Sequence, residues 1–148
     1  MKTKLFIFLA IFTVLFLTAC TSSKTPTGNA IVDSKDSISI PLSDLSDKVE
    51  FYEFDSNGIK VNYFVVKGSD GKPRTAFDAC DVCGGYKGYS QRGKDVVCNN
   101  CGRVFKIDDI GSKNGPGGCW PSFLDHEIEG DNILIKESEL EKGVFRFR

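Results

Sequence analysis

Two segments of this 148-residue chain decide its fold: Cys80-Asp81-Val82-Cys83-Gly84 and Cys98-Asn99-Asn100-Cys101-Gly102. Each segment places two thiols on one turn, and 14 residues separate the two pairs. Two such turns facing one another offer four thiolates to a metal, in the tetrahedral arrangement that suits zinc or iron-sulfur chemistry. The glycine after each pair lacks a Cβ, so the loop can turn back and direct its amides at the sulfurs. The pattern therefore predicts a metal site ligated by Cys80, Cys83, Cys98 and Cys101.

A fifth cysteine follows in a similar glycine-framed turn, Gly117-Gly118-Cys119-Trp120-Pro121. Cys119 is a candidate metal ligand that could complete a cluster, replace one of the four other thiols, or pack as a buried free thiol. His126 is the only histidine and stands between Asp125 and Glu127. For such a residue a solvated surface position is favoured over metal binding.

The segments around the cysteines show the patterns of short strands. Asn57-Gly58 separates two β-like runs at 49–54 and 59–66, which predicts a hairpin because both residues tolerate the positive φ of tight turns. A second turn is expected at 69–73, a third hairpin from 95–97 and 103–107, and closing strands at 133–135 and 144–147. We therefore expect a mainly β fold (α+β with one or two short helical turns), a small single domain with two CxxCG metal knuckles between β-hairpins.

Aromatic residues gather in the sequence near the cysteines. We expect them to form core and to keep water from the site, which influences the properties of a bound metal. They are Phe77, Tyr86, Tyr89, Phe105, Trp120 and Phe123.

Residues 38–45 and 133–140 resemble one another at a constant offset, each with an Ile-x-Ile strand pattern followed by a Ser and a Leu. Each segment reads as a strand, a Ser-capped helical turn and a return strand. Units of this kind are common, so two copies alone favour coincidence. A true repeat would pair as a pseudo-symmetric frame around the cysteine segment.

The N-terminus has the layout of a bacterial lipoprotein signal. Basic residues precede an apolar run from Leu5 to Leu17, which is too short to span a membrane, and Leu17-Thr18-Ala19-Cys20 resembles a lipobox. We predict a signal peptide over 1–20, lipidation of Cys20, a flexible polar tether over 21–36 and a Cys-rich metal-binding domain over 37–148. This places the protein on the extracytoplasmic face of the cell membrane, held by its lipid.

Charge and composition exclude several functions. Removal of residues 1–20, which contain two lysines and no acid, takes the formal charge from −1 to −3, and basic and acidic residues are interspersed, so no nucleic-acid surface is predicted. The sequence contains no hydrolytic constellation, which favours a carrier or binding protein over an enzyme. Disulfides remain an alternative in an oxidising compartment, although the five cysteines after Cys20 are an odd number.

The combined pattern resembles the membrane iron-sulfur-containing FtrD-like domain family. The resemblance runs from about Val49 to the C-terminus, and it lies in the segments 76–83, 87–89, 97–105, 117–121 and 129–131. It implies an iron-sulfur protein associated with bacterial high-affinity iron uptake, often as a membrane or lipid-anchored component. Trp120 stands where the family usually has Asn, so any role of that Asn does not carry over.

Three functions follow from these observations. The first is an electron carrier in which Cys80, Cys83, Cys98, Cys101 and Cys119 hold an iron-sulfur cluster or iron, with membrane components of an iron-uptake system as partners. The second is an interaction module in which four cysteines hold structural zinc. The third is thiol-disulfide exchange, against which stands the lack of a helical pattern after either CxxC pair.

Overall fold

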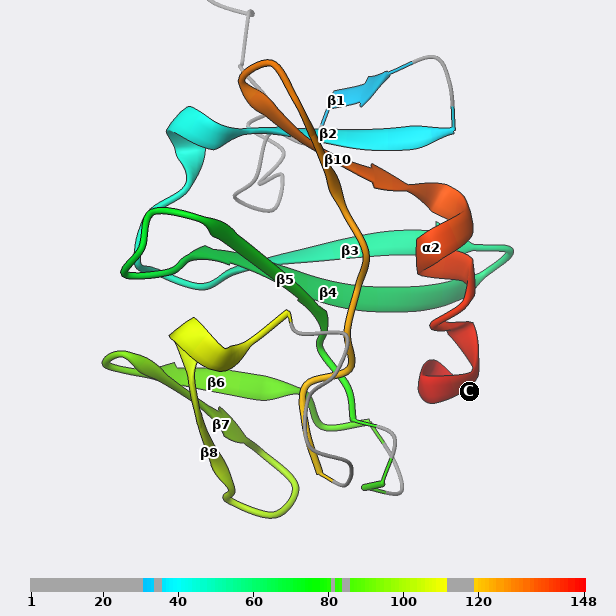
Figure 1. Cartoon of the computed structure of the whole chain (residues 1–148). Helices are drawn as coiled ribbons and strands as arrows, with labels where there is room; N and C mark the ends of the chain where they lie inside the picture. The colour runs from blue at the N-terminus through cyan, green and yellow to red at the C-terminus, as the bar shows by residue number, and fades with distance from the viewer. Residues whose placement is uncertain (1–30, 34–35, 81, 84–85, 112–118) are drawn as a thin grey trace, which may run out of the picture.

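Three small antiparallel sheets lie one below another in this protein (Figure 1). The computed structural model describes residues 31–33, 36–80, 82–83, 86–111 and 119–148. The first sheet has the order β1 (Ile31–Asp33), β2 (Ser37–Pro41), β10 (Asn132–Lys136) and β9 (Glu127–Glu129). The second sheet contains β3 (Glu50–Ser56), β4 (Ile59–Lys67) and β5 (Pro73–Phe77). The third contains β6 (Tyr89–Arg92), β7 (Asp95–Cys98) and β8 (Val104–Lys106).

Among the described residues, four short helical segments connect or follow the strands. Three are 3-10 turns and one is α-helical: η1 (Leu42–Asp44), η2 (Ile107–Asp109), α2 (Glu137–Glu141) and η3 (Val144–Phe147). The predicted fold class, mainly β with short helical turns, is confirmed. Within the residues that the structure describes, no helix is long and apolar enough to cross a membrane.

The predicted hairpins are confirmed. Asn57 and Gly58 have φ of 54° and 85°, and Gly58 N donates to Asp55 Oδ1 at 2.8 Å, which fixes the tight turn between β3 and β4. The turn between β4 and β5 is closed by Gly68 N, which donates to Lys72 O at 2.8 Å. Strands β7 and β8 pair across the second CxxC turn. The sequence missed β1, β6 and β9, because they are short and β9 is fully exposed.

Strand β4 divides the interior into two cores. Its apolar run is buried on both faces, so Val61, Tyr63 and Val65 face one cluster of side chains and Phe64 and Val66 face the other. The first core joins β4 to Ile40 and Ile133 of the upper sheet. The second joins β4 to the third sheet and includes Cys98, and Cys80, Cys83 and Cys119 pack against it. The metal-binding end of the molecule is therefore attached to the rest through a shared core.

The two similar segments, 38–45 and 133–140, lie side by side. Strands β2 and β10 are antiparallel neighbours in which Ile38 pairs with Ile135 and Ile40 with Ile133. Each strand leads into a helical turn, and Leu45 and Leu140 are buried in the same core. The two units therefore pair as expected of a true repeat, although the sequence favoured coincidence, but they do not frame the cysteine segment, which lies at the other end of the molecule (Figure 1).

Two details of the predicted units are wrong. The helical turns begin after Pro41 and Lys136, and neither has a side-chain cap from serine. Residues 144–147 form the 3-10 turn η3, where the sequence predicted a strand. Gly143, directly before this turn, has helical dihedrals and packs so closely on Phe77 that a Cβ would lie 2.7 Å from Phe77 Cδ1.

The N-terminal predictions fall largely outside the described residues. The signal peptide at 1–20 with Cys20 and most of the tether at 21–36 are not among them. Strand β1 lies inside the segment that was expected to be a tether, and it pairs with β2.

Candidate metal centre

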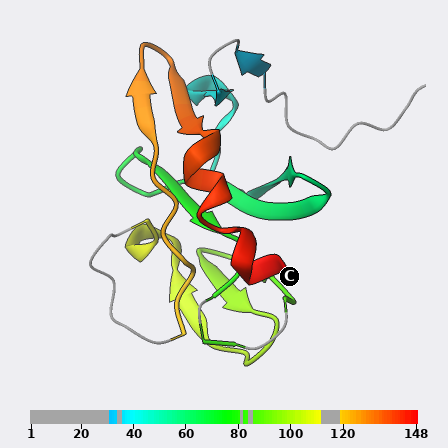
Figure 2. The same ribbon diagram turned by 90° about the vertical axis from the view of Figure 1, so that its right-hand side faces the viewer.

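Three segments of the chain carry the cysteines to one end of the molecule. Cys80 and Cys83 lie in the loop after β5, Cys98 ends β7, and Cys101 lies in the turn that leads to β8. The loop after β5 and the turn between β7 and β8 both lie at the lower end of the molecule in Figure 1. Cys119 begins the segment that leads to β9, which Figure 2 shows running along the molecule from the third sheet to the first.

The first CxxC turn contains an amide-to-sulfur hydrogen bond. Cys83 N donates to Cys80 Sγ at 3.2 Å. Burial raises the pKa of Cys80, but this bond and neighbouring donors outweigh burial, so the pKa lies below its usual value. Gly84, the predicted glycine of this turn, lies outside the described residues. Cys80 is therefore the thiol of this turn that most readily becomes a thiolate, the form that binds metal.

The second CxxC turn closes on itself through its backbone. Gly102 N donates to Cys98 O at 2.8 Å, and Cys98 N donates to Arg103 O at 2.9 Å. Gly102 has φ of 74°, which glycine adopts without the steric cost of a Cβ, so the predicted sharp turn is confirmed, although the Gly102 amide donates to a carbonyl and not to a sulfur. A backbone hydrogen bond from Arg103 lowers the pKa of Cys101 to about 7. This exposed thiol is partly ionised at neutral pH.

Cys119 reaches the other thiols because the residues after it pair with the end of β5. Phe123 forms an isolated bridge with Ala76, and Phe77 N donates to Ser122 O at 2.9 Å. Ser122 N donates to Ala79 O at 3.2 Å. Since β5 leads directly into Cys80, this pairing brings Cys119 beside the first CxxC turn.

The sulfur atoms lie at distances that suit a metal ion. Cys119 Sγ lies 3.3 Å from Cys101 Sγ, 3.7 Å from Cys83 Sγ and 4.0 Å from Cys80 Sγ. The sulfurs of Cys80, Cys83, Cys98 and Cys119 all lie within 4.8 Å of one another. A tetrahedral ion with metal–sulfur bonds of about 2.3 Å has sulfurs about 3.8 Å apart. These four thiols therefore fit one four-coordinate metal.

Five thiols share a site that offers four tetrahedral positions. All five are free thiols, and Cys101 is the exposed one. Cys101 lies outside the group of four but contacts Cys119, so either of these two could occupy a position at the solvent edge. Hydrogen bonding to Cys80 raises the pKa of Cys83 to about 11, and burial raises the pKa of Cys119. Without metal, Cys80 and Cys101 therefore ionise more readily than Cys83 and Cys119 do.

Asp78 is a buried acid that joins the two CxxC turns. It is 6% exposed, and its carboxylate accepts hydrogen bonds from Tyr89 N and from the Tyr86 hydroxyl, both at 2.6 Å. Gly88 has φ of 69°, and a Cβ there would lie 2.9 Å from Asp78 Cγ and closer still to an oxygen. Gly88 O in turn accepts from Asn99 N at 3.0 Å. Burial raises the pKa of Asp78 to about 6, although both hydrogen bonds favour the ionised form.

No role was predicted for Asp78 or Gly88 from the sequence. Both lie in segments that carry the family resemblance, 76–83 and 87–89, and that position is the signal that could have identified them. Their contact depends on two loops that meet only in the folded protein.

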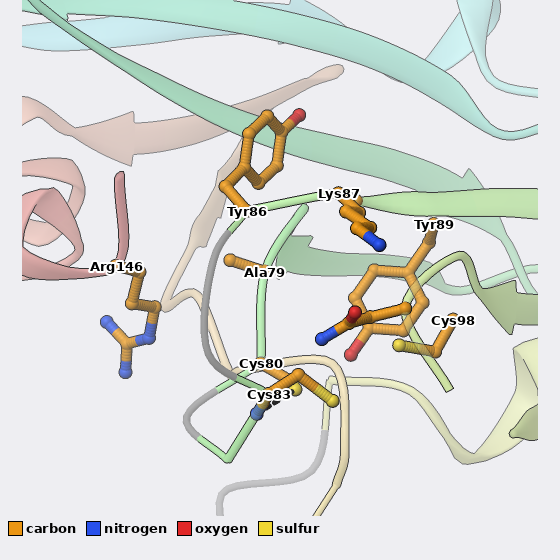
Figure 3. Close-up of a pocket in the computed structure, with 10 residues that line it drawn as sticks. Ala79, Cys80, Cys83, Tyr86, Lys87, Tyr89, Cys98 and Arg146 are labelled. Atoms are coloured by element: carbon orange, nitrogen blue, oxygen red, sulfur yellow. Dashed lines mark hydrogen bonds between the residues drawn. The ribbon is translucent and has the colours of Figure 1, made fainter. Parts of the chain in front are cut away.

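The aromatic residues divide into core and surface. Phe77, Tyr89 and Phe105 are buried, and Trp120 packs against Phe105 with ring centroids 5.1 Å apart. Tyr86 is 43% exposed, so its predicted place in the core is wrong. Tyr89 lines a small cavity with Cys80, Cys83 and Cys98, and its hydroxyl points toward these sulfurs in Figure 3. Burial and the neighbouring thiolates raise the pKa of Tyr89.

His126 is not among the grouped sulfur ligands. Its Nδ1 lies 2.8 Å from Thr75 Oγ1, and the hydroxyl of Thr75 also donates to Leu124 O at 2.6 Å. The residue is partly buried, where the sequence favoured a solvated position, and burial lowers its pKa. His126 therefore belongs to the packing between β5 and the segment before β9.

Comparison with known proteins gives one family. The family model described as "Membrane iron-sulfur containing protein FtrD-like" matches residues 45–147. No curated protein and no solved structure matches the chain. The matched residues include all five cysteines of the site, whose soft thiolate ligands are those that iron-sulfur clusters, iron and zinc use.

Proposed function

Because the chain belongs to the FtrD-like family of membrane iron-sulfur containing proteins, we propose that it is an electron carrier with a cysteine-ligated iron-sulfur cluster or iron. It acts on the extracytoplasmic face of the cell membrane, anchored by lipid on Cys20, and serves iron uptake. The observation that carries the proposal is the convergence of thiols from three separate segments, four of them within 4.8 Å of one another.

The arrangement of the site supports electron transfer. Cys98 is buried and packs with the second core, whereas Cys101 is exposed at the edge of the same site. A metal held here is shielded on one side by Tyr89 and Phe105 and reaches the surface on the other. Shielding by apolar side chains and hydrogen bonds to sulfur set the reduction potential of such a centre. The exposed edge gives a membrane partner of the iron-uptake system a short path to the metal.

A structural zinc site is the second candidate, and the sulfur spacing is compatible with it. The observed spacing fits one tetrahedral ion, either zinc or a single iron. A cluster places several irons and sulfides between the thiolates, so it requires sulfurs that lie farther apart. The family favours iron and the spacing favours a single ion, and a single iron satisfies both.

Metal analysis of the full chain, purified without oxygen in detergent, tests the proposal. Iron, acid-labile sulfide and the visible spectrum separate three outcomes. Iron with stoichiometric sulfide indicates a cluster, and iron without sulfide indicates a single tetrathiolate ion. A colourless protein with one zinc contradicts the electron carrier.

Variants in the anchor and in the site complete the test. Cys20→Ser should abolish incorporation of labelled fatty acid and release the protein from membranes, whereas Ser22→Ala should do neither. Cys98→Ser should lose most of the iron because it removes a buried thiol of the group of four. Iron content that is unchanged in Cys98→Ser would contradict the proposed ligand set.

A further inference from the structure

Two buried donors lack a hydrogen-bond partner of good geometry within the residues that the structure describes, the Tyr89 hydroxyl and Trp120 Nε1, although Cys80 lies near enough to the Tyr89 hydroxyl to raise its pKa. Tyr89 belongs to the second core together with Cys98, and Trp120, Cys80, Cys83 and Cys119 pack against it. A buried hydroxyl without a partner costs about 1–3 kcal/mol, so such groups are rare and call for an explanation. Because both donors lie in or against the core that holds the cysteines, the sulfurs of a metal-bound site are candidate acceptors.

The Tyr89 side chain is held in place from several sides. Its ring makes edge contacts with Phe64 and Phe105, with ring centroids 6.1 Å apart in each case. Its backbone is fixed by the hydrogen bond to Asp78 and by pairing with Cys98 across β6 and β7. The side chain is 5% exposed, so the hydroxyl has no access to bulk water. It is fixed in the direction that Figure 3 shows, toward the sulfurs of Cys80, Cys83 and Cys98.

Once a metal is bound, the acceptor that faces this hydroxyl is a metal-bound cysteine sulfur. Thiolates bound to a metal carry negative charge and accept hydrogen bonds, and outer donors of this kind tune the metal and its affinity. In an iron centre the reduced form carries one more negative charge than the oxidised form. A donor therefore stabilises the reduced form more and raises the reduction potential.

We propose that the Tyr89 hydroxyl donates a hydrogen bond to a sulfur of the loaded metal centre, so that it strengthens metal binding and raises the potential of bound iron. The effect on the potential rests on the function proposed above. The effect on affinity does not, because it holds equally for zinc. Tyr89 thus acts as a positioning and tuning residue whose hydroxyl is satisfied only when metal is bound.

Tyr89→Phe tests this proposal because it removes the hydroxyl and leaves the ring contacts. Tyr63→Phe is the matched control, since Tyr63 is 1% exposed but belongs to the other core. For the metal-free full chain, the urea midpoint of Tyr89→Phe should equal or exceed that of the parent, because a buried donor without a partner has been removed. A purely structural role for the hydroxyl predicts the opposite, a lower midpoint.

With metal bound, the expected effects reverse. Tyr89→Phe should bind zinc or iron about tenfold more weakly in competition with a chelator, within the range known for outer-shell partners. If iron is bound, the equilibrium between its reduced and oxidised forms should shift about tenfold toward the oxidised form, which lowers the potential by about 59 mV for one electron. Tyr63→Phe should change neither quantity.

The outcomes separate this proposal from the proposed function. Zinc alone in the purified protein would overturn the electron carrier, and the zinc affinity of Tyr89→Phe would still decide the role of Tyr89. An affinity equal to that of the parent, or a destabilised metal-free Tyr89→Phe, would overturn the hydrogen bond to the centre. Iron with an unchanged potential in Tyr89→Phe would overturn the tuning effect and leave the electron carrier intact.

Discussion

Gly88→Ala should be far more destabilising than a similar substitution at the neighbouring turn between β6 and β7. Gly88 and Gly93 have similar dihedrals, with φ of 69° and 61°. A side chain costs about 1–2 kcal/mol in this left-handed region at either position. At Gly93 a Cβ meets nothing within 4 Å, so Gly93→Ala should lose only this amount.

At Gly88 the added Cβ displaces the carboxylate of Asp78. That carboxylate accepts two buried hydrogen bonds, from Tyr89 N and from the Tyr86 hydroxyl. Hydrogen bonds to charged groups contribute about 1.5–3 kcal/mol each, so the loss of one or both adds about 3 kcal/mol to the cost of Gly88→Ala. With a urea m-value of about 2 kcal/mol/M, the midpoints of the two variants should differ by about 1.5 M.

Urea unfolding of the metal-free full chain in detergent measures this difference, with Trp120 as the single fluorescent tryptophan. Equal midpoints for Gly88→Ala and Gly93→Ala would refute the contact with Asp78. A double variant provides a second check, because residues in contact show non-additive effects. Once Asp78→Ala has removed the carboxylate, Gly88→Ala should cost no more than Gly93→Ala does.

Three further predictions concern single residues. The lowered pKa of Cys101, about 7, predicts that iodoacetamide modifies this exposed thiol of the reduced, metal-free chain before Cys119, with a rate that rises around pH 7 in peptide mass spectra. Burial raises the pKa of Asp78 from 3.8 to about 6, so the folded state binds this proton more tightly than the unfolded chain does. The free energy of unfolding should therefore fall by about 3 kcal/mol between about pH 4 and pH 6 and level off above, and Asp78→Asn should flatten that part of a urea-unfolding profile. Gly143→Ala should lower the urea midpoint by about 1 M, because its Cβ would overlap the Phe77 ring and overpacking costs about 1–3 kcal/mol; an unchanged midpoint would contradict that contact.

The parts of the fold that the sequence predicted are those that depend on neighbouring residues. Asn57-Gly58 specifies its hairpin because both residues accept the positive φ that the turn requires. The CxxC-Gly turns are likewise local, and Gly102 adopts the expected conformation. The residue types and spacing of a local turn are visible in the sequence, so its geometry can be inferred from them.

The errors arise where distant packing decides the conformation. Residues 144–147, Val-Phe-Arg-Phe, have the β-branched and aromatic side chains typical of a strand, yet they form a 3-10 turn. Gly143 packs on Phe77, and the guanidinium of Arg146 lies over the same ring, 4.9 Å from its centroid. Phe77 precedes these residues by more than 60 positions, so no local pattern could reveal the contact.

The candidate site shows the same division. The sequence identifies all five thiols as candidates, but their mutual distances depend on non-local pairing. Cys119 meets Cys101 and Cys83 only because Phe123 and Ser122 add to the end of β5. Asp78 escaped notice because an acid next to a cysteine motif is ordinary in sequence, and its role becomes visible only when Tyr89 and Gly88 surround it.

The contacts that position the thiols are independent of any metal. The first turn is held by Asp78, whose N–H donates to Asn62 O at 2.9 Å. The second CxxC turn is held by its own backbone hydrogen bonds and by the core around Val96 and Phe105. Cys119 is held because the residues after it pair with β5. In zinc fingers metal binding supplies the free energy of folding, because no preformed site exists without the metal. Here strands and two cores bring the sulfurs together, so metal binding need not supply the free energy that assembles the fold.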